Sequence, residues 1–456
     1  MSDNQTIIEG YDSRGTKEKK EYPAYKESNV EYLSEIPDTW TTSKIKFMFD
    51  RIESGTTPSR SNKDYYDGDI GWVTVEDLNE GFVSDTEEKV TEYALEDNTG
   101  LEVYPEGTLL MAMYASIGKL GILDFPSSTN QACCALISPK DDVVSEYVFY
   151  TLLALREDLI KISYGGVQDN ISQGIVRNFH IHRPPLEDQK DIVEFLNRAT
   201  KKIDDLISKK RSLIELIRER EEALITNLTT TGIREHESFK QTEDDIIGDL
   251  PAGWEVSKLG NITTKLTNGY VGPTRDILVD DGVPYIQSTH INNGEINFNG
   301  EFFVSESWSE AHTTSILKKR DVLLTQSGTI VGESAVVREE FDGANCHALI
   351  IARPVKEINS SYLNLFFQSQ LGRALLQRTQ TGVTLNHLNT TSVKDVKIPI
   401  PPKEEQRKIV KHLESEREEI KSTISQIEKG IELLEEYRSV LISEAVTGQI
   451  DVRGEV

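Results

Sequence analysis

The acidic run that follows the first Pro-Pro pair has the spacing in this sequence that comes nearest to a catalytic motif. Glu187, Asp188 and Lys190 offer the acid-x-Lys arrangement of metal-dependent nucleases. Such residues would have to lie on a strand that faces further carboxylates. Here they follow Pro184-Pro185, and prolines followed by acidic residues are typical of a helix start. We therefore do not expect a nuclease site.

Other chemically capable side chains also lack partners at useful spacing. His180 and His182 would share one strand face, but no second His or Cys pair stands at metal-site spacing. Cys133 and Cys134 lie in an apolar run that predicts burial. A phosphate-binding loop and a dinucleotide-binding glycine pattern are both missing, and the segment 183–186 lacks the Asn or Asp that an amino-methyltransferase places before its two prolines. The sequence predicts no catalytic residue, metal or cofactor, which favours recognition or scaffolding.

Two long helices with a heptad rhythm organise the chain, over residues 184–228 and 401–446. Both begin with two prolines, an acidic pair and a Gln, and both then carry apolar residues at alternating steps of four and three. This spacing gives a narrow seam typical of a coiled coil. We expect the seams to bury each other as an intramolecular antiparallel pair. The expected seam residues are Ile192, Leu196, Ala199, Ile203, Leu206, Leu213, Ile217 and Leu224 in the first helix, and Ile409, Leu413, Ile420, Ile427, Leu434, Tyr437 and Leu441 in the second.

The segments before the helices are duplicated as well. Ile36-Pro37-Asp38-Thr39-Trp40 is matched by Leu250-Pro251-Ala252-Gly253-Trp254, and the matches continue through short β-type runs up to each Pro-Pro pair. A repeat of about 215 residues is too long for a solenoid. Turn-bounded strands with one helical portion, 143–160 in the first copy and 361–376 in the second, predict an α+β class.

Composition limits the possible classes of protein. The chain has 456 residues, of which 37% are hydrophobic and 28% charged, which favours a folded soluble protein. No apolar run approaches the roughly 18 residues that a membrane span needs, and three cysteines make no disulfide framework, so we expect a cytoplasmic location. The net charge is −26; the excess is concentrated in residues 41–183, whereas 254–398 is close to neutral. If nucleic acid binds here, basic groups must be clustered or supplied by a partner.

Taken together, the Pro-Trp entrances, the duplicated helix starts and the closing run Glu444–Asp451 resemble the specificity subunits of type I restriction-modification systems. The stretch from Tyr25 to Trp40 is similar to the opening of that family, and the likeness extends over residues 24–453. The resemblance implies two tandem, pseudo-twofold-related, β-rich target recognition domains of the α+β class, separated by two long antiparallel coiled-coil helices. The implied parts are a flexible tail at 1–23, the first recognition domain at 24–183, the first spacer helix at 184–233, a linker at 234–253, the second recognition domain at 254–398, and the second spacer helix with its tail at 399–456.

The resemblance also implies partners. Each recognition domain would read one half of a bipartite target in double-stranded DNA, and the helices would set the gap between the half-sites. Two methyltransferase (modification) subunits would dock on the helices, bind S-adenosylmethionine and methylate adenine. Motor-nuclease (restriction) subunits would complete the assembly, and no membrane partner is expected.

Base readout needs donors and acceptors on loops. In the first domain the candidate DNA-binding residues are Thr57, Ser59, Arg60, Asn62, Lys63, Tyr114, Ser116, Lys119, Gln168 and Asn170. In the second domain they are Asn268, Tyr270, Arg275, Gln287, Ser288, His290, Gln326, Ser327, Thr329, Thr384, Asn386 and His387.

Two other functions are compatible with the same residues. A protein-only scaffold would use the duplicated domains to bind proteins, and its acidic surface would repel DNA. A nuclease acting alone would cleave DNA with Mg²⁺ and would lose that activity on Glu187→Ala.

Overall fold

The computed structural model describes residues 20–163, 170–233, 238–326, 331–379 and 387–455. The chain divides into two compact units, one formed by residues 1–209 with 430–456 and the other by residues 210–429. Two long helices, α5 (Leu186–Thr230) and α10 (Lys403–Val446), contribute to both units.

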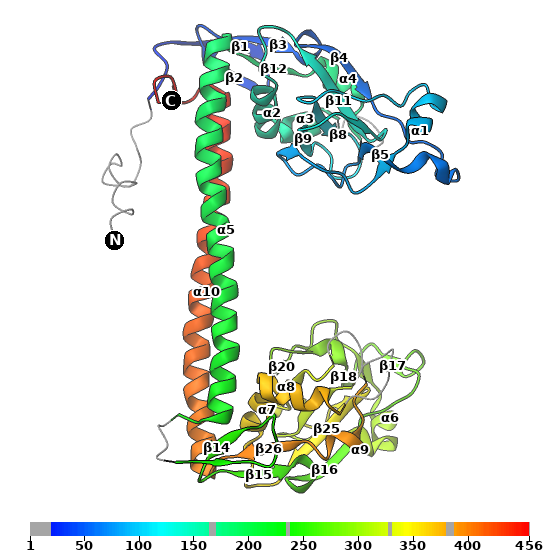
Figure 1. Ribbon diagram of the computed structural model, residues 1–456, viewed down its shortest axis with the longest axis vertical. Helices are drawn as coiled ribbons and strands as arrows, with labels where there is room; N and C mark the ends of the chain where they lie inside the picture. The colour runs from blue at the N-terminus through cyan, green and yellow to red at the C-terminus, as the bar shows by residue number, and fades with distance from the viewer. Residues whose placement is uncertain (1–19, 164–169, 234–237, 327–330, 380–386, 456) are drawn as a thin grey trace. The chain divides into compact units, whose positions relative to one another are not determined.

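The first unit pairs small sheets with short helices (Figure 1). Its strands are β1 (Tyr25–Val30), β2 (Leu33–Pro37), β3 (Thr41–Lys44), β4 (Phe49–Ser54), β5 (Tyr66–Val73), β6 (Phe82–Val83), β7 (Lys89–Val90), β8 (Leu109–Ala112), β9 (Leu120–Leu123), β10 (Ser127–Thr129), β11 (Cys133–Pro139) and β12 (His180–Arg183). Its short helices are α1 (Glu92–Asp97), α2 (Ser145–Ala154), α3 (Arg156–Ser163) and α4 (Gln173–Asn178), with 3-10 turns η1 (Ile45–Phe47) and η2 (Lys63–Tyr65). The main sheet has the order β4-β11-β8-β9-β6, beside β10-β5-β7, β1-β2 and β12-β3.

The second unit repeats this plan. Its strands are β13 (Phe239–Gln241), β14 (Asp249–Pro251), β15 (Glu255–Lys258), β16 (Thr263–Asn268), β17 (Leu278–Val279), β18 (Val283–Ile286), β19 (Ile291–Asn292), β20 (Glu295–Ile296), β21 (Phe303–Val304), β22 (Val322–Thr325), β23 (Ser334–Val336), β24 (Asn345–Cys346), β25 (Leu349–Pro354) and β26 (Lys397–Ile400). Its short helices are α6 (Glu306–Ala311), α7 (Ser360–Gln368), α8 (Gln370–Gln377) and α9 (Thr390–Val393), with 3-10 turns η3 (Leu259–Asn261), η4 (Ser288–His290), η5 (Thr313–Ser315) and η6 (Glu339–Phe341). The main sheet has the order β16-β25-β22-β23, beside β17-β21-β18-β24, β13-β14, β15-β26 and β19-β20.

Alternation along the central strands gives each main sheet two buried faces. In the second unit, Val322 and Leu324 of β22 join a core with α7, α8 and the ends of both long helices. Leu323, between them, points to the other core beside Ile286 of β18. Because successive side chains point to opposite faces of a strand, one apolar strand supplies both layers. The predicted α+β class is confirmed.

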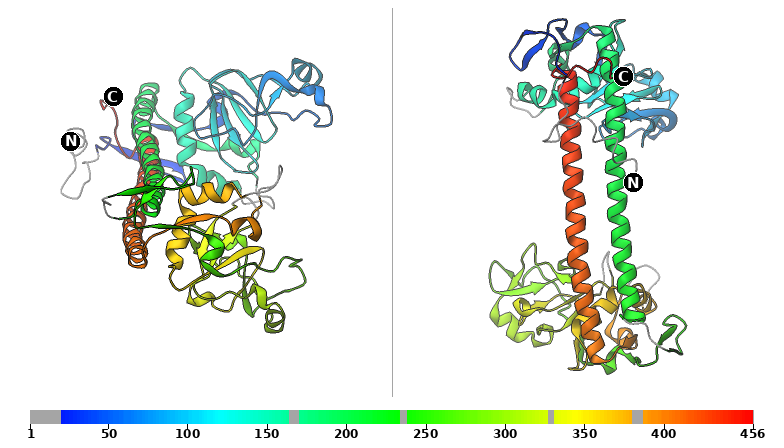
Figure 2. Two further views of the ribbon diagram at one scale, coloured as in Figure 1. Left: turned by 60° about the horizontal axis from the view of Figure 1, so that its bottom comes forward. Right: turned by 90° about the vertical axis from the view of Figure 1, so that its left-hand side faces the viewer.

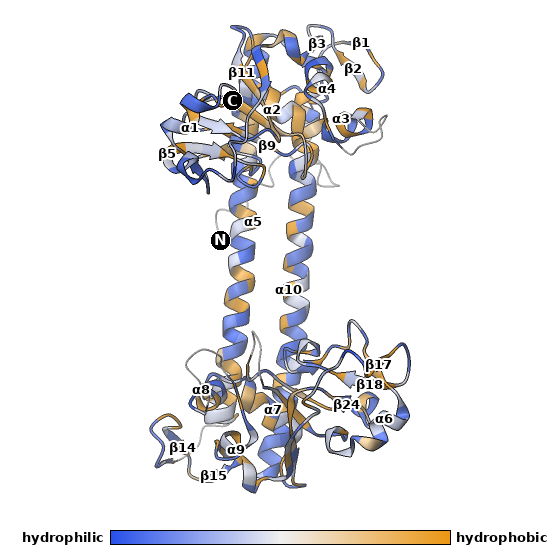
Figure 3. Cartoon of the chain, turned by 90° about the vertical axis from the view of Figure 1, so that its right-hand side faces the viewer, coloured by the Kyte–Doolittle hydropathy of each residue, from blue (hydrophilic) through white to orange (hydrophobic). Residues whose placement is uncertain are grey.

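The long helices pair antiparallel, as expected. Figure 2 shows α5 and α10 side by side. In the first unit Arg438 of α10 lies 3.0 Å from Asp204 of α5, and in the second unit Arg417 binds Glu221 at 2.7 Å. Figure 3 shows both helices as largely hydrophilic with interspersed apolar residues, the pattern of a narrow seam.

The predicted seam was wrong by one residue along the middle of α5. Leu206 and Leu213 are exposed, whereas the adjacent Ile207 and Ile214 are buried. Tyr437 of α10 is likewise exposed, and Ile431, which the predicted seam left out, is buried. At each of the two positions in α5 two neighbouring apolar residues compete for the seam, and sequence alone does not decide between them.

A buried glutamine fixes the start of α5 to the first unit. The side chain of Gln189 accepts a hydrogen bond from the Val144 N–H at 2.9 Å and donates to the Pro184 carbonyl at 3.0 Å. The preceding Asp188 accepts a hydrogen bond from the indole of Trp40 at 3.1 Å. The acidic-Gln pair after the prolines is therefore an anchor, in which each residue has a defined backbone or indole partner.

The second unit contains the same anchor. Gln406 accepts from the Asn359 N–H at 2.8 Å and donates to the Pro401 carbonyl at 2.9 Å. Glu405 accepts from the indole of Trp254 at 3.1 Å. Both tryptophans are fully buried, so each Pro-Trp entrance closes over the start of its own long helix.

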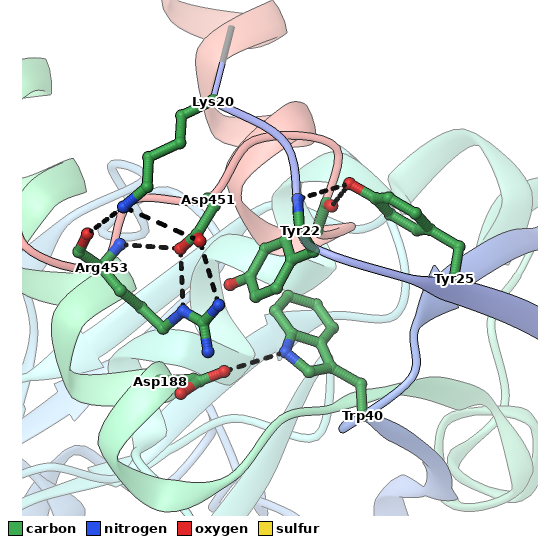
Figure 4. Close-up of polar contacts among 8 residues, drawn as sticks. Lys20, Tyr22, Tyr25, Trp40, Asp188, Asp451 and Arg453 are labelled. Atoms are coloured by element: carbon green, nitrogen blue, oxygen red, sulfur yellow. Dashed lines mark hydrogen bonds and ion pairs between the residues drawn. The ribbon is translucent and has the colours of Figure 1, made fainter.

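In the first unit, the residues around Lys20 clasp the segment that follows α10 (Figure 4). The Asp451 N–H donates to the Lys20 carbonyl at 2.6 Å, and the Lys20 ammonium donates to the Arg453 carbonyl at 2.7 Å. The Arg453 guanidinium binds Asp451 and stacks over the ring of Tyr22, 4.5 Å from its centroid. These contacts join segments from opposite ends of the described chain.

Gly448 makes this closure possible. Its φ of +74° ends α10 in the left-handed conformation that glycine adopts without strain. A Cβ at this position would lie 2.6 Å from Pro37 and 3.2 Å from Trp40. The Gly448 carbonyl also accepts a hydrogen bond from the Tyr25 hydroxyl at 3.0 Å, so the helix end packs directly on the Pro-Trp entrance.

Candidate nucleic-acid interface

Three strand ends of the second unit are held together by backbone hydrogen bonds. The N–H of Tyr270, just beyond β16, donates to the carbonyl of Cys346 at 2.9 Å. The N–H of His347 donates to the carbonyl of Ile286, the last residue of β18, at 2.8 Å, and the Ala348 N–H returns to the Tyr270 carbonyl at 2.9 Å. The side chains that follow β16, β18 and β24 therefore emerge at one edge of the unit.

Amide side chains gather at this edge. Gln326, which follows β22, is only 5% exposed and is therefore not the open loop residue that the sequence suggested; its amide nitrogen lies 3.5 Å from the amide oxygen of Asn268 and supports that side chain. The Leu388 N–H donates to the Gln326 carbonyl at 2.9 Å, which brings the exposed His387 alongside. Gln287 follows β18 and is half-buried. Amides both donate and accept, and so can read the edge of a purine through two hydrogen bonds.

The first unit builds the same edge. The Thr56 N–H donates to the Thr129 carbonyl at 2.9 Å, as Tyr270 does to its partner in the second unit. The Asn130 N–H donates to the Val73 carbonyl at 3.0 Å, which corresponds to the bond of His347. Both units thus gather the ends of corresponding strands through corresponding backbone bonds.

Three predicted site residues lie on this edge of the first unit. The Ile171 N–H donates to the Met113 carbonyl at 3.1 Å, and this bond brings Asn170 next to Tyr114. Tyr114 is 41% exposed, and Thr57 directly follows the anchored Thr56.

Arg60 is exposed but its charge is already paired. Its guanidinium binds both carboxylate oxygens of Glu88 and lies 4.9 Å from the ring centroids of both Tyr66 and Trp72. The hydrogen bonds from Arg60 lower the pKa of the Glu88 carboxyl. This pair neutralises a cation that the sequence offered for phosphate binding.

The rest of that loop is shaped by local hydrogen bonds. Asn62 accepts from the Asp64 N–H at 3.2 Å and so begins η2. The hydroxyls of Ser59 and Ser61 lie 2.8 Å apart, and Lys63 is exposed. Ser59, Asn62 and Lys63 therefore lie in a loop whose shape is set by its own hydrogen bonds.

The remaining predicted residues are distributed unevenly. Ser116 and Lys119 form the turn after β8, closed by a Lys119 N–H to Ser116 carbonyl bond of 3.0 Å. In the second unit Arg275 and Ser288 are exposed. The other five residues of the prediction lie outside the described part of the chain: Gln168, Ser327, Thr329, Thr384 and Asn386.

His290 is not the exposed loop residue that the sequence suggested. Its side chain is 1% exposed and packs against Phe298 and Phe302. Its Nδ1 accepts a hydrogen bond from the Gln287 N–H at 3.1 Å, which caps η4. In this conformation the imidazole supports the turn and does not face solvent.

An aromatic cluster beside Tyr270 was missed from the sequence. The rings of Trp308 and His312 stack at 4.0 Å between centroids, and the Tyr270 ring meets both edge-on at 5.0 and 5.1 Å. His347 completes the cluster and lies 3.1 Å from the Tyr285 hydroxyl. The contact of His347 with Tyr285 joins residues 62 positions apart in the sequence and carries no local sequence signal.

The described residues offer little for catalysis. Burial raises the pKa of Cys133 and of Cys134 to about 12, so both thiols stay protonated. Glu187 binds Lys190 at 2.9 Å on the helix surface. Within the described ranges no three His, Cys, Asp or Glu side chains are grouped to hold a metal ion, and no helix there is long and apolar enough to cross a membrane.

The helix pair carries apolar residues on one exposed side. In the first unit Leu206, Leu433 and Val440 are 42%, 56% and 45% exposed. In a heptad whose positions a and d form the buried seam, Leu206 is at position g, and Leu433 and Val440 are at position c. Positions c and g are neighbours on one flank of a helix, and in an antiparallel pair the corresponding flanks of the two helices lie on the same side. In the second unit Leu213 and Leu216 of α5 occupy the same heptad positions. Exposed apolar residues in such an arrangement are typical of a protein contact.

Comparison with known proteins agrees with this architecture. The family model of the type I restriction modification DNA specificity domain matches residues 37–216 and again residues 251–433. The MjaIX type I restriction enzyme specificity subunit of Methanocaldococcus jannaschii is 29% identical over 445 residues, covering 94% of this chain and 96% of that protein. The EcoBI specificity subunit of Escherichia coli is 24% identical over 439 residues, covering 93% and 89%.

A solved structure supports the fold. A chain from a type I R-M system, reported for its complex assembly and conformational transition, superposes with a TM-score of 0.66 at 15% identity, covering 92% of this chain and 99% of that one. The two matches to the family model together span most of the sequence and fall on the two duplicated halves. The chain belongs to the family of type I restriction-modification DNA specificity proteins.

Proposed function

We propose that this chain is the non-catalytic DNA sequence-recognition subunit of a type I restriction-modification complex, and that each recognition domain reads one half of a bipartite target. The observation that carries the proposal is the duplicated edge of gathered strand ends, lined by Asn268 and Gln287 in the second unit and by Thr57, Tyr114 and Asn170 in the first. Amides and hydroxyls held on a rigid sheet edge suit hydrogen bonds to base edges in the major groove.

The domain boundaries belong to the same proposal. Recognition domains at residues 24–183 and 254–398 would alternate with spacer helices within 184–233 and 399–456. The helices would set the half-site spacing, because equivalent faces of DNA recur about every 10–10.5 base pairs. The anchors at Gln189 and Gln406 support this role, since each fixes the start of a spacer helix to its own domain.

Partners would supply the chemistry. Two methyltransferase subunits would dock on the helix pair, and the exposed apolar side chains of Leu206, Leu433 and Val440 suit such a contact. Those subunits would bind the methyl donor, and motor-nuclease subunits would add restriction. A cytoplasmic location is part of the proposal and is supported by three buried free thiols.

The negative charge of the first domain affects the affinity for DNA that we expect of the chain. Neutralising phosphates provides most non-specific affinity for DNA, yet residues 41–183 carry excess negative charge and Arg60 is paired with Glu88. We expect the chain alone to bind DNA weakly and the methyltransferase subunits to provide most of the basic surface. Equal affinity of the chain alone and of the full complex would contradict this division.

The test is to map adenine methylation made by the chain with its methyltransferase subunits in a host that lacks other methylation. One bipartite motif is expected. Gln287→Ala should then relax one half-site only, and Asn170→Ala the other half only, each lost two-bond contact weakening discrimination by roughly 1–3 kcal/mol. Lys356→Ala, an exposed change in the second unit away from the strand-end edge, is the control.

The outcomes separate the candidate functions. If the chain binds the methyltransferase but the complex selects no DNA sequence, the protein-only scaffold is the better account. Cleavage of DNA by the chain alone with Mg²⁺, lost on Glu187→Ala, would favour a nuclease. A motif whose two halves both change with Gln287→Ala would contradict the assignment of one half-site to each domain.

A further inference from the structure

Val271 stands out among the apolar residues of the second unit. Its side chain is 67% exposed, more than any other large apolar side chain in the described part of the chain. It directly follows Tyr270 on the edge where the strand ends gather. An isolated exposed valine needs no explanation on an ordinary surface, but this one follows a residue that is bonded into a candidate base-reading edge.

The backbone on both sides of Val271 is fixed. Tyr270 is held by backbone bonds to Cys346 of β24 and to Ala348, and by ring contacts with Trp308 and His312. The Tyr270 ring also folds over Gly272, where an added Cβ would lie 2.5 Å from the tyrosine hydroxyl. The aromatic cluster therefore holds the turn in one conformation, and a ligand that meets Val271 does not have to order it first.

The chemistry around Val271 restricts what it could contact. The amides of Asn268 and Gln287 follow strand ends on the same edge, and amides suit hydrogen-bonding base edges. In the major groove the C5 methyl of thymine is the apolar group that a protein can distinguish. An exposed aliphatic side chain on the same edge as these amides therefore suits a thymine near a purine whose edge the amides read.

The first unit has a related residue at this position. Thr56 makes the backbone bond that Tyr270 makes in the second unit, so Thr57 corresponds to Val271. Threonine and valine have nearly the same shape, and both present a methyl group.

We propose that Val271 is a specificity-determining residue that contacts the C5 methyl of a thymine in the half-site read by the second domain, and that the Tyr270–Trp308–His312 cluster positions it. The inference rests on the proposed function and names one base class within it.

The experiment uses the chain in complex with its methyltransferase subunits and duplexes that carry the mapped target. Each thymine of the second half-site is replaced in turn by deoxyuridine, which keeps base pairing and removes only the methyl. The wild-type complex should bind at least one deoxyuridine duplex about fourfold more weakly, the effect of one buried methyl-sized group. Val271→Ser should bind both duplexes equally, and Val271→Thr should keep the preference.

Val279→Ser is the matched control, because it makes the same change at another exposed valine of the same unit and should keep the wild-type ratio. Equal wild-type binding to every deoxyuridine duplex, a half-site without thymine, or a preference that survives Val271→Ser would each overturn the inference while leaving sequence recognition intact. If the wild-type complex discriminates no sequence at all, the proposed function fails first, and the inference fails with it.

Discussion

The two buried glutamines that anchor the long helices predict a separable loss of stability in each unit. In Gln189→Leu the Val144 N–H and the carbonyls of Pro184 and Asp142 lose their partners. In Gln406→Leu the Asn359 N–H and the Pro401 carbonyl do so. A buried polar group left without a hydrogen bond costs about 1–3 kcal/mol. With at least two such groups in each variant, we expect a loss of about 3 kcal/mol, or about two decades in the local opening constant.

Native-state hydrogen exchange is the appropriate assay, because it resolves local opening where a single unfolding curve would average the two units. Gln189→Leu should accelerate exchange in α2 and at the start of α5, and leave α7 unchanged. Gln406→Leu should do the reverse. The control is Gln426→Leu, the same substitution at an exposed position of α10, which should stay within about 0.5 kcal/mol of wild type.

Two results would refute this reasoning. A change below about 0.5 kcal/mol in both anchor variants would mean that water replaces the glutamine in each pocket at no cost. Equal acceleration of α2 and α7 by either single variant would mean that the anchors do not act within their own units.

Three further expectations can be measured directly. Leu206→Glu places a charge on the apolar side of the helix pair and should reduce copurification of the methyltransferase subunits, with thermal stability unchanged. Asp205→Asn, at the neighbouring residue, should not reduce copurification. Unchanged copurification with Leu206→Glu would exclude that side as the docking surface. Glu88→Gln frees the Arg60 guanidinium and should steepen the dependence of log affinity for DNA on log salt concentration by up to about one charge, a slope change near 0.9. Arg60→Ala should leave this slope unchanged. A slope that changes with Arg60→Ala but not with Glu88→Gln would show that Arg60 already contacts phosphate. Burial lowers the pKa of His182 to about 4 from an unfolded value of 6.5. Because the unfolded chain is protonated first as the pH falls, up to about 3 kcal/mol of the stability present above pH 6.5 should be lost by pH 4. His182→Gln should flatten this part of a curve of stability against pH, and an unchanged curve would exclude the histidine as its source.

The parts of the fold that follow from local pattern were predictable from the sequence. The heptad rhythm gave the two long helices, and the paired Pro-Trp entrances gave the duplication, because both are short-range signals repeated in order. The position of the seam was not predictable through the middle of α5. The pairs Leu206-Ile207 and Leu213-Ile214 each offer two apolar residues, and packing against α10 decides which one is buried.

Local sequence pattern predicts the residues of the candidate site less well than it predicts the helices and the duplication. Residues next to strand ends, such as Asn268 and Tyr114, were found because the strands could be aligned between the two copies. The pairing of Arg60 with Glu88 and the burial of His290 depend on contacts with residues on other turns of the chain. A polar residue in a turn-rich segment has the same local sequence signal whether it faces solvent or caps a helix.

The clasp at Lys20 has a consequence for the order in which the chain is made. The second unit consists of one continuous stretch, residues 210–429, and has all its parts as soon as that stretch has left the ribosome. The first unit is begun earlier but waits for Gly448, Asp451 and Arg453 to cover Trp40 and Tyr22. During synthesis the half made first is therefore the half completed last, and it keeps an open apolar entrance throughout translation of the second.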